Sequence, residues 1–258
     1  AVNILGNPND FSKINELIKD RDIILLEDNC ESLGAKYKGK KTGTFGLVGT
    51  FSSFFSHHIC TMEGGVIVTD NEEIYNILLC MRAHGWTRNL PEENTLGYKK
   101  NKNSFYESFN FILPGYNVRP LEFSGATGIE QIKKIPNMLT KRKVNSKKFN
   151  ENLKDIDFIQ TQKEIGVSSW FGFSLVIKDS RIKRDSLIQN LNTIGFECRP
   201  IVSGNFTKQK AIKYIDYEIH GSLENADFIH DNGIFIGNHH IDIRDGLDEL
   251  RKILVHLS

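Results

Sequence analysis

Three apolar runs separated by glycine-rich turns constrain the fold of this chain most strongly. Apolar residues predominate in Ile23–Glu27 and Val66–Thr69, and they make up half of Thr50–Phe55. None of these runs alternates apolar with polar residues, which is typical of strands buried on both faces of a sheet. Helices are expected from Asp10, before the strands, and from Asp70–Asn71, after them. This order predicts an α/β domain whose mostly parallel sheet carries helices on both faces.

The second half of the chain predicts a smaller unit. A long helical region begins beyond Pro120, and apolar strands are expected at Trp170–Ile177 and Phe196–Val202. Amphipathic helices accompany both strands. We therefore assign residues 1–136 to part of a large domain and residues 137–258 to a small α+β domain.

The charge balance argues against two classes of partner. Lys and Arg number 33 against 32 Asp and Glu, a formal net charge of +1. No single-sign field is therefore available to hold nucleic acid or an anionic membrane. The apolar runs are a few residues long, whereas a membrane-spanning helix needs roughly 20. The four scattered cysteines do not suggest a secreted disulfide framework, so the cytoplasm is the expected compartment.

Candidate chemistry lies where the first strand ends. Glu27 and Asp28 close that strand, and ligands of open α/β sheets bind at the carboxyl ends of strands. Taken alone, Asp28 is explained as a cap of the following turn. However, its block, EDNCESLGAKYKGKKTGTFG, is followed by FSSFFSHHICTMEGG and then by GYNVRPLEFSGATGIEQ. In this order the three blocks resemble the DegT/DnrJ/EryC1/StrS nucleotide-sugar aminotransferases, which have the fold type I architecture and use pyridoxal phosphate.

The resemblance implies roles for individual side chains. Asp28 takes the place of the residue that pairs with the pyridine nitrogen of the cofactor, and Ser52 that of a phosphate ligand. Glu31 stands where the family usually has a glutamine facing the cofactor ring. Asn117 matches the residue that reaches the cofactor phosphate of the neighbouring subunit, which implies a homodimer with shared active sites.

The sequence departs from the family pattern at the catalytic lysine, where it has His57. An imidazole cannot form the Schiff base that a primary amine forms with the cofactor aldehyde. With an ordinary pKa of about 6.5, it still acts as a general acid or base near neutral pH. This exchange resembles a subgroup of deoxysugar 3-dehydratases that hold pyridoxamine phosphate non-covalently, so His57 is the expected catalytic base.

The resemblance also implies a reaction and its partners. The expected substrate is a nucleotide-linked 4-keto-6-deoxyhexose of the GDP-4-keto-6-deoxy-D-mannose type, dehydrated at C3 for surface-polysaccharide synthesis, with glutamate as the amino donor. A second subgroup of these dehydratases carries an iron-sulfur cluster on four cysteines. Cys30 coincides with the first of these ligands, but the other ligands stand just after the helix that ends near His84, where this chain has no cysteine. We therefore expect no cluster, and interpret all four cysteines as packed residues.

Two arginines are candidates for binding the substrate. Arg88 opens the polar segment 89–110, and a guanidinium group suits the oxygens of a diphosphate. A plain surface position is an equal alternative for Arg88. Arg199 lies in a segment that resembles the one that closes over the substrate in this subgroup.

Other polar clusters are interpreted as structural. The Lys141–Arg142–Lys143 stretch is expected to form a solvated helix face. His239 and His240 would point to opposite faces of a strand and so would not share a metal ion, and no metal site is expected. The same geometry would separate His57 from His58, whose role we take as structural.

Two other functions stay open on the sequence. One is a pyridoxal-phosphate-dependent sugar aminotransferase that tolerates His57, and the other is a non-catalytic truncated paralogue. In the family, a front segment supplies a Gly-Ser turn for the phosphate and an aromatic residue over the ring, and neither stands upstream of Asp28. We therefore expect a fragment or the product of a truncated gene, which alone binds the cofactor weakly.

Overall fold

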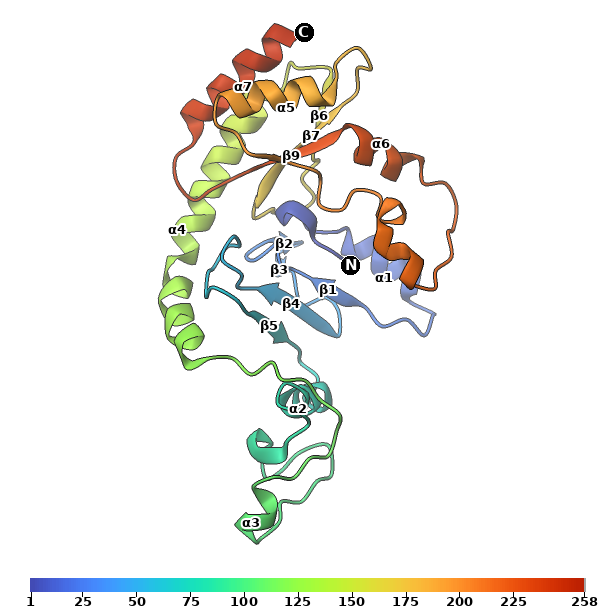
Figure 1. Ribbon diagram of the computed structural model, residues 1–258, viewed down its shortest axis with the longest axis vertical. Coiled ribbons are helices and arrows are strands. Elements are labelled where there is room, and N and C mark those ends of the chain that lie inside the picture. Colours follow the sequence, from blue (N-terminus) through green and yellow to red (C-terminus); the bar gives the residue numbers. More distant parts are fainter. Residues whose placement is uncertain (258) are drawn as a thin grey trace. The chain divides into compact units, whose positions relative to one another are not determined.

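Residues 1–257 are described by a computed structural model, in which the chain divides into two units (Figure 1). Unit 1 comprises residues 1–3 and 9–134, and unit 2 comprises residues 4–8 and the chain from Ile135 onward. The short segment 4–8 differs from the sequence-based division, which placed it in the first domain. It joins unit 2 because the Phe171 and Ser169 N–H groups donate to the carbonyls of Leu5 (3.1 Å) and Gly6 (2.9 Å).

Unit 1 is built on a three-stranded sheet in the order β1-β4-β5. The elements are α1 (Phe11–Ile18), β1 (Leu26–Asp28), β2 (Lys36–Tyr37), β3 (Lys40–Lys41), β4 (Val48–Ser52), β5 (Gly65–Val68), α2 (Glu72–Met81), the 3-10 turn η2 (Thr87–Asn89), α3 (Ser104–Glu107) and the start of α4 (Glu122–Leu153). Strand β1 runs parallel to β4, with Asp28 opposite Thr50, whereas β4 and β5 are antiparallel, with Ser52 opposite Gly65. The mixed α/β class is confirmed, but parallel pairing does not dominate this sheet. The reason is that the loop 53–64 returns the chain directly, whereas a parallel strand needs a longer crossover.

The two helices predicted around the sheet begin at the expected caps. The Asp10 side chain accepts from the Lys13 N–H (3.2 Å), and Asn71 accepts from the Ile74 N–H (2.9 Å). Each carboxylate or amide oxygen thereby satisfies one N–H group that the first turn of a helix leaves without an intrahelical partner.

The expectation of a sheet covered on both faces is wrong for this chain. Leu26 and Ile67 expose 55% and 50% of their surface. Helix α1 buries only Phe11, whose ring stacks on Phe45 at 4.1 Å and meets Tyr37 edge-on at 6.0 Å. The helix therefore covers the glycine-rich segment rather than the sheet.

Unit 2 contains a four-stranded antiparallel sheet in the order β6-β7-β9-β8. Its elements are the 3-10 turns η1 (Ile4–Gly6), η3 (Phe206–Lys208) and η4 (Lys210–Tyr214), the strands β6 (Ile159–Thr161), β7 (Gly172–Ile177), β8 (Cys198–Arg199) and β9 (Gly233–Gly237), and the helices α5 (Arg184–Thr193), α6 (Glu224–Asn232) and α7 (Arg244–Leu257). Apolar residues of α4, α5 and α7 pack against one face of β7 and β9, and Phe149 stacks on Phe173 at 4.2 Å. This core stabilises the small α+β unit that the sequence predicts.

The interpretation of Lys141–Arg142–Lys143 as a solvated helix face is wrong for its central residue. Arg142 is 4% exposed and donates to the carbonyls of Phe171 (3.1 Å) and Asn238. Burial lowers the pKa of this guanidinium to about 10. This position of α4 therefore faces the interior of its own unit, where the carbonyls next to the ends of β7 and β9 accept hydrogen bonds from the guanidinium.

The geometric argument about His239 and His240 is also wrong. These residues lie beyond β9, which ends at Gly237, and their ring centroids are 4.2 Å apart. Without a strand, neighbouring side chains need not alternate. Within the described part of the chain, no three His, Cys, Asp or Glu side chains converge as a set of metal ligands. Over residues 1–257, no helix combines the length and apolar character that crossing a membrane requires.

Candidate active site

Three polar side chains at the carboxyl end of β1 lie in two different environments. Asp28 is exposed, whereas its neighbours Glu27 and Asn29 are 1% and 0% exposed. This follows from the alternation of side chains along a strand. The Asp28 carboxylate accepts from the Cys30 N–H (3.0 Å), which fixes its direction while leaving it open to a ligand.

Glu27 has a structural role that the sequence reasoning did not assign. Its carboxylate accepts from the N–H groups of Gly43 (2.6 Å), Phe45 (2.5 Å) and Gly46 (2.8 Å). These donors belong to the glycine-rich segment between β3 and β4. Glu27 thus ties the segment leading into β4 to the strand that carries Asp28. A carboxylate followed by several glycines is the only sequence signal of this contact.

Ser52 lies at the end of β4, opposite Gly65. Its hydroxyl accepts from the Phe54 N–H (3.1 Å), so the hydroxyl proton can be donated to an anion. The loop that follows is closed at its base, because the Thr61 hydroxyl donates to Ser53 Oγ (2.6 Å) and the Ser53 N–H donates to the Gly64 carbonyl (3.0 Å). Gly64 has φ +144°, and a Cβ there would lie 2.8 Å from Ser53 Oγ.

His57 is presented by this closed loop. Its N–H donates to the Phe54 carbonyl (2.9 Å), and its half-buried ring meets the Phe54 ring edge-on at 5.8 Å. Burial lowers the pKa of His57, and the Asp28 carboxylate acts in the opposite direction. The two side chains are therefore close enough for the Asp28 charge to act on the imidazole. His58 is instead 4% exposed, and the two residues lie in a bend rather than a strand.

Cys30 and Glu31 follow Asp28 in the turn after β1. Burial, together with the neighbouring Asp28 carboxylate, raises the pKa of the Cys30 thiol to about 12. The thiol is therefore protonated at neutral pH and is a poor metal ligand or nucleophile. Glu31 is half-buried and adds to the negative field around this thiol.

Asn117 is exposed on a turn whose backbone is tightly held. The turn pairs with the chain that follows α2: the His84 N–H donates to the Tyr116 carbonyl (2.8 Å), and the Val118 N–H donates to the Arg82 carbonyl (3.0 Å). A Cβ on Gly115 would overlap the backbone of Gly85, so only glycine permits this approach. The exposed Asn117 amide thus projects from a rigid support.

The two candidate substrate arginines differ in their surroundings. Arg88 is exposed, and its guanidinium lies 3.9 Å from the centroid of the buried Trp86 ring. Arg199 lies in unit 2, where its guanidinium forms an exposed ion pair with Glu197 (2.6 Å). Stacking leaves the in-plane N–H groups of Arg88 available to an anion, whereas those of Arg199 are directed in part at a carboxylate.

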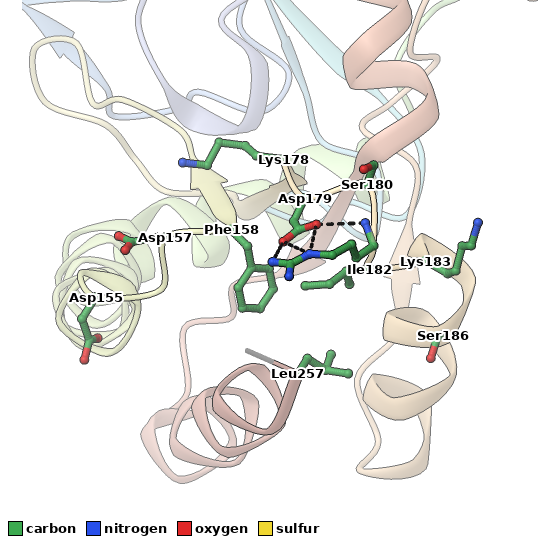
Figure 2. Close-up of a pocket in the computed structure, with 11 residues that line it drawn as sticks. Asp155, Asp157, Phe158, Lys178, Asp179, Ser180, Ile182, Lys183, Ser186 and Leu257 are labelled. Carbon is green, nitrogen blue, oxygen red and sulfur yellow. Dashed lines mark hydrogen bonds and ion pairs between the residues drawn. The ribbon is translucent and has the colours of Figure 1, made fainter.

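A separate cavity of about 1050 Å³ lies in unit 2 (Figure 2). Its lining includes Phe158, Lys178 and Arg181, and Asp179 holds Arg181 through two hydrogen bonds to the N–H of Nε (2.9 and 3.0 Å) and one ion pair (2.5 Å). None of the described residues that line it is a predicted site residue. The residues that the sequence predicts for the active site thus do not line this cavity.

Comparison with known proteins places this geometry in a family. The model of the DegT/DnrJ/EryC1/StrS aminotransferase family matches residues 1–246. The chain belongs to this family. It is 58% identical over 256 residues to GDP-4-keto-6-deoxy-D-mannose 3-dehydratase of Escherichia coli, and 55% identical to the enzyme of the same name of Yersinia pseudotuberculosis. In both cases the match covers 98% of this chain, which spans 66% and 65% of the respective relatives.

Solved structures agree with this assignment. The Escherichia coli 3-dehydratase with bound hydrated pyridoxal phosphate superposes with a TM-score of 0.95, over 98% of this chain and 66% of the solved chain. A solved variant of a GDP-4-keto-6-deoxymannose-3-dehydratase, in which asparagine replaces one histidine, holds GDP-perosamine. A Helicobacter pylori aminotransferase, 20% identical, has a TM-score of 0.82 over 99% of this chain and 65% of its own, and shares the fold. The resemblance noted in the sequence is therefore confirmed at the level of family and fold.

Proposed function

We propose that this protein is a pyridoxamine-phosphate-dependent dehydratase that removes the C3 hydroxyl of GDP-4-keto-6-deoxy-D-mannose. The observation that carries the proposal is the half-buried His57 imidazole within electrostatic range of the Asp28 carboxylate. The base is thus an imidazole instead of a primary amine, which suits proton transfer without covalent storage of the cofactor. The 58% identity to an enzyme of this name supports the choice of substrate.

The side chains present fit a pyridoxamine phosphate site. The open Asp28 carboxylate can hold a proton on the pyridine nitrogen, Ser52 has a hydroxyl proton for the phosphate, and Glu31 lies in the turn beside them. When bound, this cofactor supplies an amine for the C4 ketone and a ring that withdraws electrons. The structure of an Escherichia coli relative with bound hydrated pyridoxal phosphate supports this choice of cofactor.

Each residue then has one task. Asp28 would keep the pyridine nitrogen protonated, and the neutral imidazole of His57 would accept a proton from carbon and then donate it to the C3 hydroxyl, which leaves as water. Burial favours the neutral form of His57, because it lowers the pKa of the ring. Arg88 supplies in-plane N–H groups for the diphosphate.

Three further parts of the proposal concern partners and compartment. Glutamate would restore the amine that is lost as ammonia after each turnover. A second copy of the chain would receive the exposed Asn117 amide at its cofactor phosphate, so that two sites form across a homodimer. The four free thiols support the reducing cytoplasm as the compartment.

The test is the reaction itself, with the intact protein, GDP-4-keto-6-deoxy-D-mannose, pyridoxamine phosphate and glutamate. Mass spectrometry of the sugar should show the loss of the C3 oxygen, together with release of ammonia and formation of 2-oxoglutarate. His57→Ala should abolish this loss, whereas Glu63→Gln, an exposed change in the same block, should not. An amino sugar as the product would indicate a transaminase, and an unchanged sugar would indicate a protein without this activity.

A further inference from the structure

The polar segment 89–110 is organised by one side chain, Glu107. Its carboxylate accepts from the Thr87 hydroxyl (2.6 Å), the Tyr98 hydroxyl (2.5 Å) and the Asn101 N–H (2.8 Å). These donors come from three places in the chain. Hydrogen bonds to an ionised carboxylate are stronger than neutral ones, so Glu107 fixes the path of the segment.

The same segment holds the Trp86 side chain and the backbone at Thr87. Thr87 is 0% exposed, and its N–H donates to the Asn110 carbonyl (3.1 Å). The Trp86 Nε1–H donates to the Ser108 carbonyl (3.0 Å), and the Phe109 ring stacks on the Trp86 ring at 5.3 Å. Residues 86 and 87 are thus held by hydrogen bonds and ring stacking to residues 107–110, and Glu107 is the charged residue among these partners.

Arg88 follows directly and has its guanidinium 3.9 Å from the Trp86 ring centroid. A stacked guanidinium keeps its plane fixed and its N–H groups exposed, which lowers the entropy lost when an anion binds. The direction of Arg88 therefore depends on the Trp86 ring and on the backbone at Thr87. Both are held by the segment that Glu107 closes.

We propose that Glu107 is a positioning residue for the nucleotide diphosphate: by binding Thr87 and Tyr98, it holds Trp86 and Arg88 in the orientation that receives the phosphate oxygens. This inference rests on the proposed function, in which Arg88 binds the diphosphate. Glu107 itself does not touch the substrate.

The test compares Glu107→Gln with Glu93→Gln in the intact protein. Glu93 is an exposed residue of the same segment, so its variant controls for loss of a charge there. The glutamine amide keeps one acceptor oxygen, but its NH₂ group would face hydrogen-bond donors that the carboxylate accepts from in the native protein. Calorimetric titration with GDP should show affinity weakened about tenfold in Glu107→Gln, which corresponds to about 1.4 kcal/mol, and unchanged in Glu93→Gln.

Two further measurements separate positioning from a general loss of structure. The KM for the nucleotide sugar should rise about tenfold, while kcat stays within about twofold, because kcat is measured with the enzyme saturated by substrate. The spectral conversion of the cofactor by glutamate should also stay within about twofold, because glutamate carries no diphosphate. Trypsin should also cleave faster at Lys99, Lys100 or Lys102 in Glu107→Gln.

The outcomes distinguish this inference from the proposed function. Unchanged GDP affinity in Glu107→Gln overturns the inference, whether or not trypsin cleavage accelerates. GDP affinity that is unchanged in Arg88→Ala overturns it as well. If Glu107→Gln weakens the affinity for GDP but the native protein does not dehydrate the sugar, Glu107 is supported as a positioning residue and the proposed reaction is refuted.

Discussion

Replacement of Glu27 by glutamine should destabilise unit 1 and loosen the site around Asp28. In the native chain one carboxylate oxygen of Glu27 accepts from Phe45 and Gly46, and the other accepts from Gly43. The glutamine amide has one acceptor oxygen and one NH₂ group, so the Gly43 N–H would face a donor. Gly43 is buried, so water does not replace the lost partner.

The size of the effect follows from that single lost contact. A hydrogen bond to a charged group contributes roughly 1.5–3 kcal/mol, and a buried donor left without a partner costs a similar amount. We therefore expect Glu27→Gln to lower the free energy of unfolding by about 2–3 kcal/mol. For a chain of this size, that loss lowers the midpoint of thermal unfolding by roughly 4–12 °C.

The two tryptophans allow the measurement to be confined to unit 1. The chain has 2 tryptophans, of which Trp86 lies in unit 1 and Trp170 in unit 2. In a Trp170→Phe background, urea unfolding followed by fluorescence reports on unit 1 through Trp86. Glu16→Gln, an exposed change on α1, is the matched control. A difference below about 0.5 kcal/mol between the two variants would refute the reasoning, since surface substitutions alone give that much.

Three further predictions concern the site. His57→Lys in the intact protein should create a covalent, borohydride-reducible link to pyridoxal phosphate with a new visible absorbance, because a primary amine attacks the aldehyde, and dehydration should fall severely; dehydration at the parental rate would remove His57 as the base. Burial lowers the pKa of His57 more than the Asp28 carboxylate raises it, so an NMR titration should give a pKa below the ordinary value of about 6.5, and a still lower pKa in Asp28→Asn. The imidazole therefore accepts protons above its pKa and loses this capacity as the pH falls through it. A pKa above about 6.5 would contradict this reasoning. Mixing Asn117→Ala with His57→Ala subunits should partly restore activity, because one site of a mixed dimer is intact, whereas proven subunit exchange without recovery would place both residues in one subunit's site.

The sequence alone determined features that depend on local order. The helices α1 and α2 are capped by Asp10 and Asn71, because a cap acts on an N–H group within the same turn. The place of Asp28 at a strand end and the presence of His57 in the loop after β4 follow from the order of the chain. Because these features involve neighbours in sequence, periodicity and motif spacing predict them.

Only the tertiary structure decided which polar residues are buried and what they bind. Arg142 looks like part of a charged helix face, yet its partners are carbonyls at Phe171 and Asn238. Glu27 binds backbone N–H groups beyond β3, and Glu107 binds Thr87 across the segment between them. Such contacts join residues with no fixed spacing, because a folded backbone offers its donors and acceptors wherever the chain turns. The identity of a charged residue therefore does not predict its role until the fold has placed its partner.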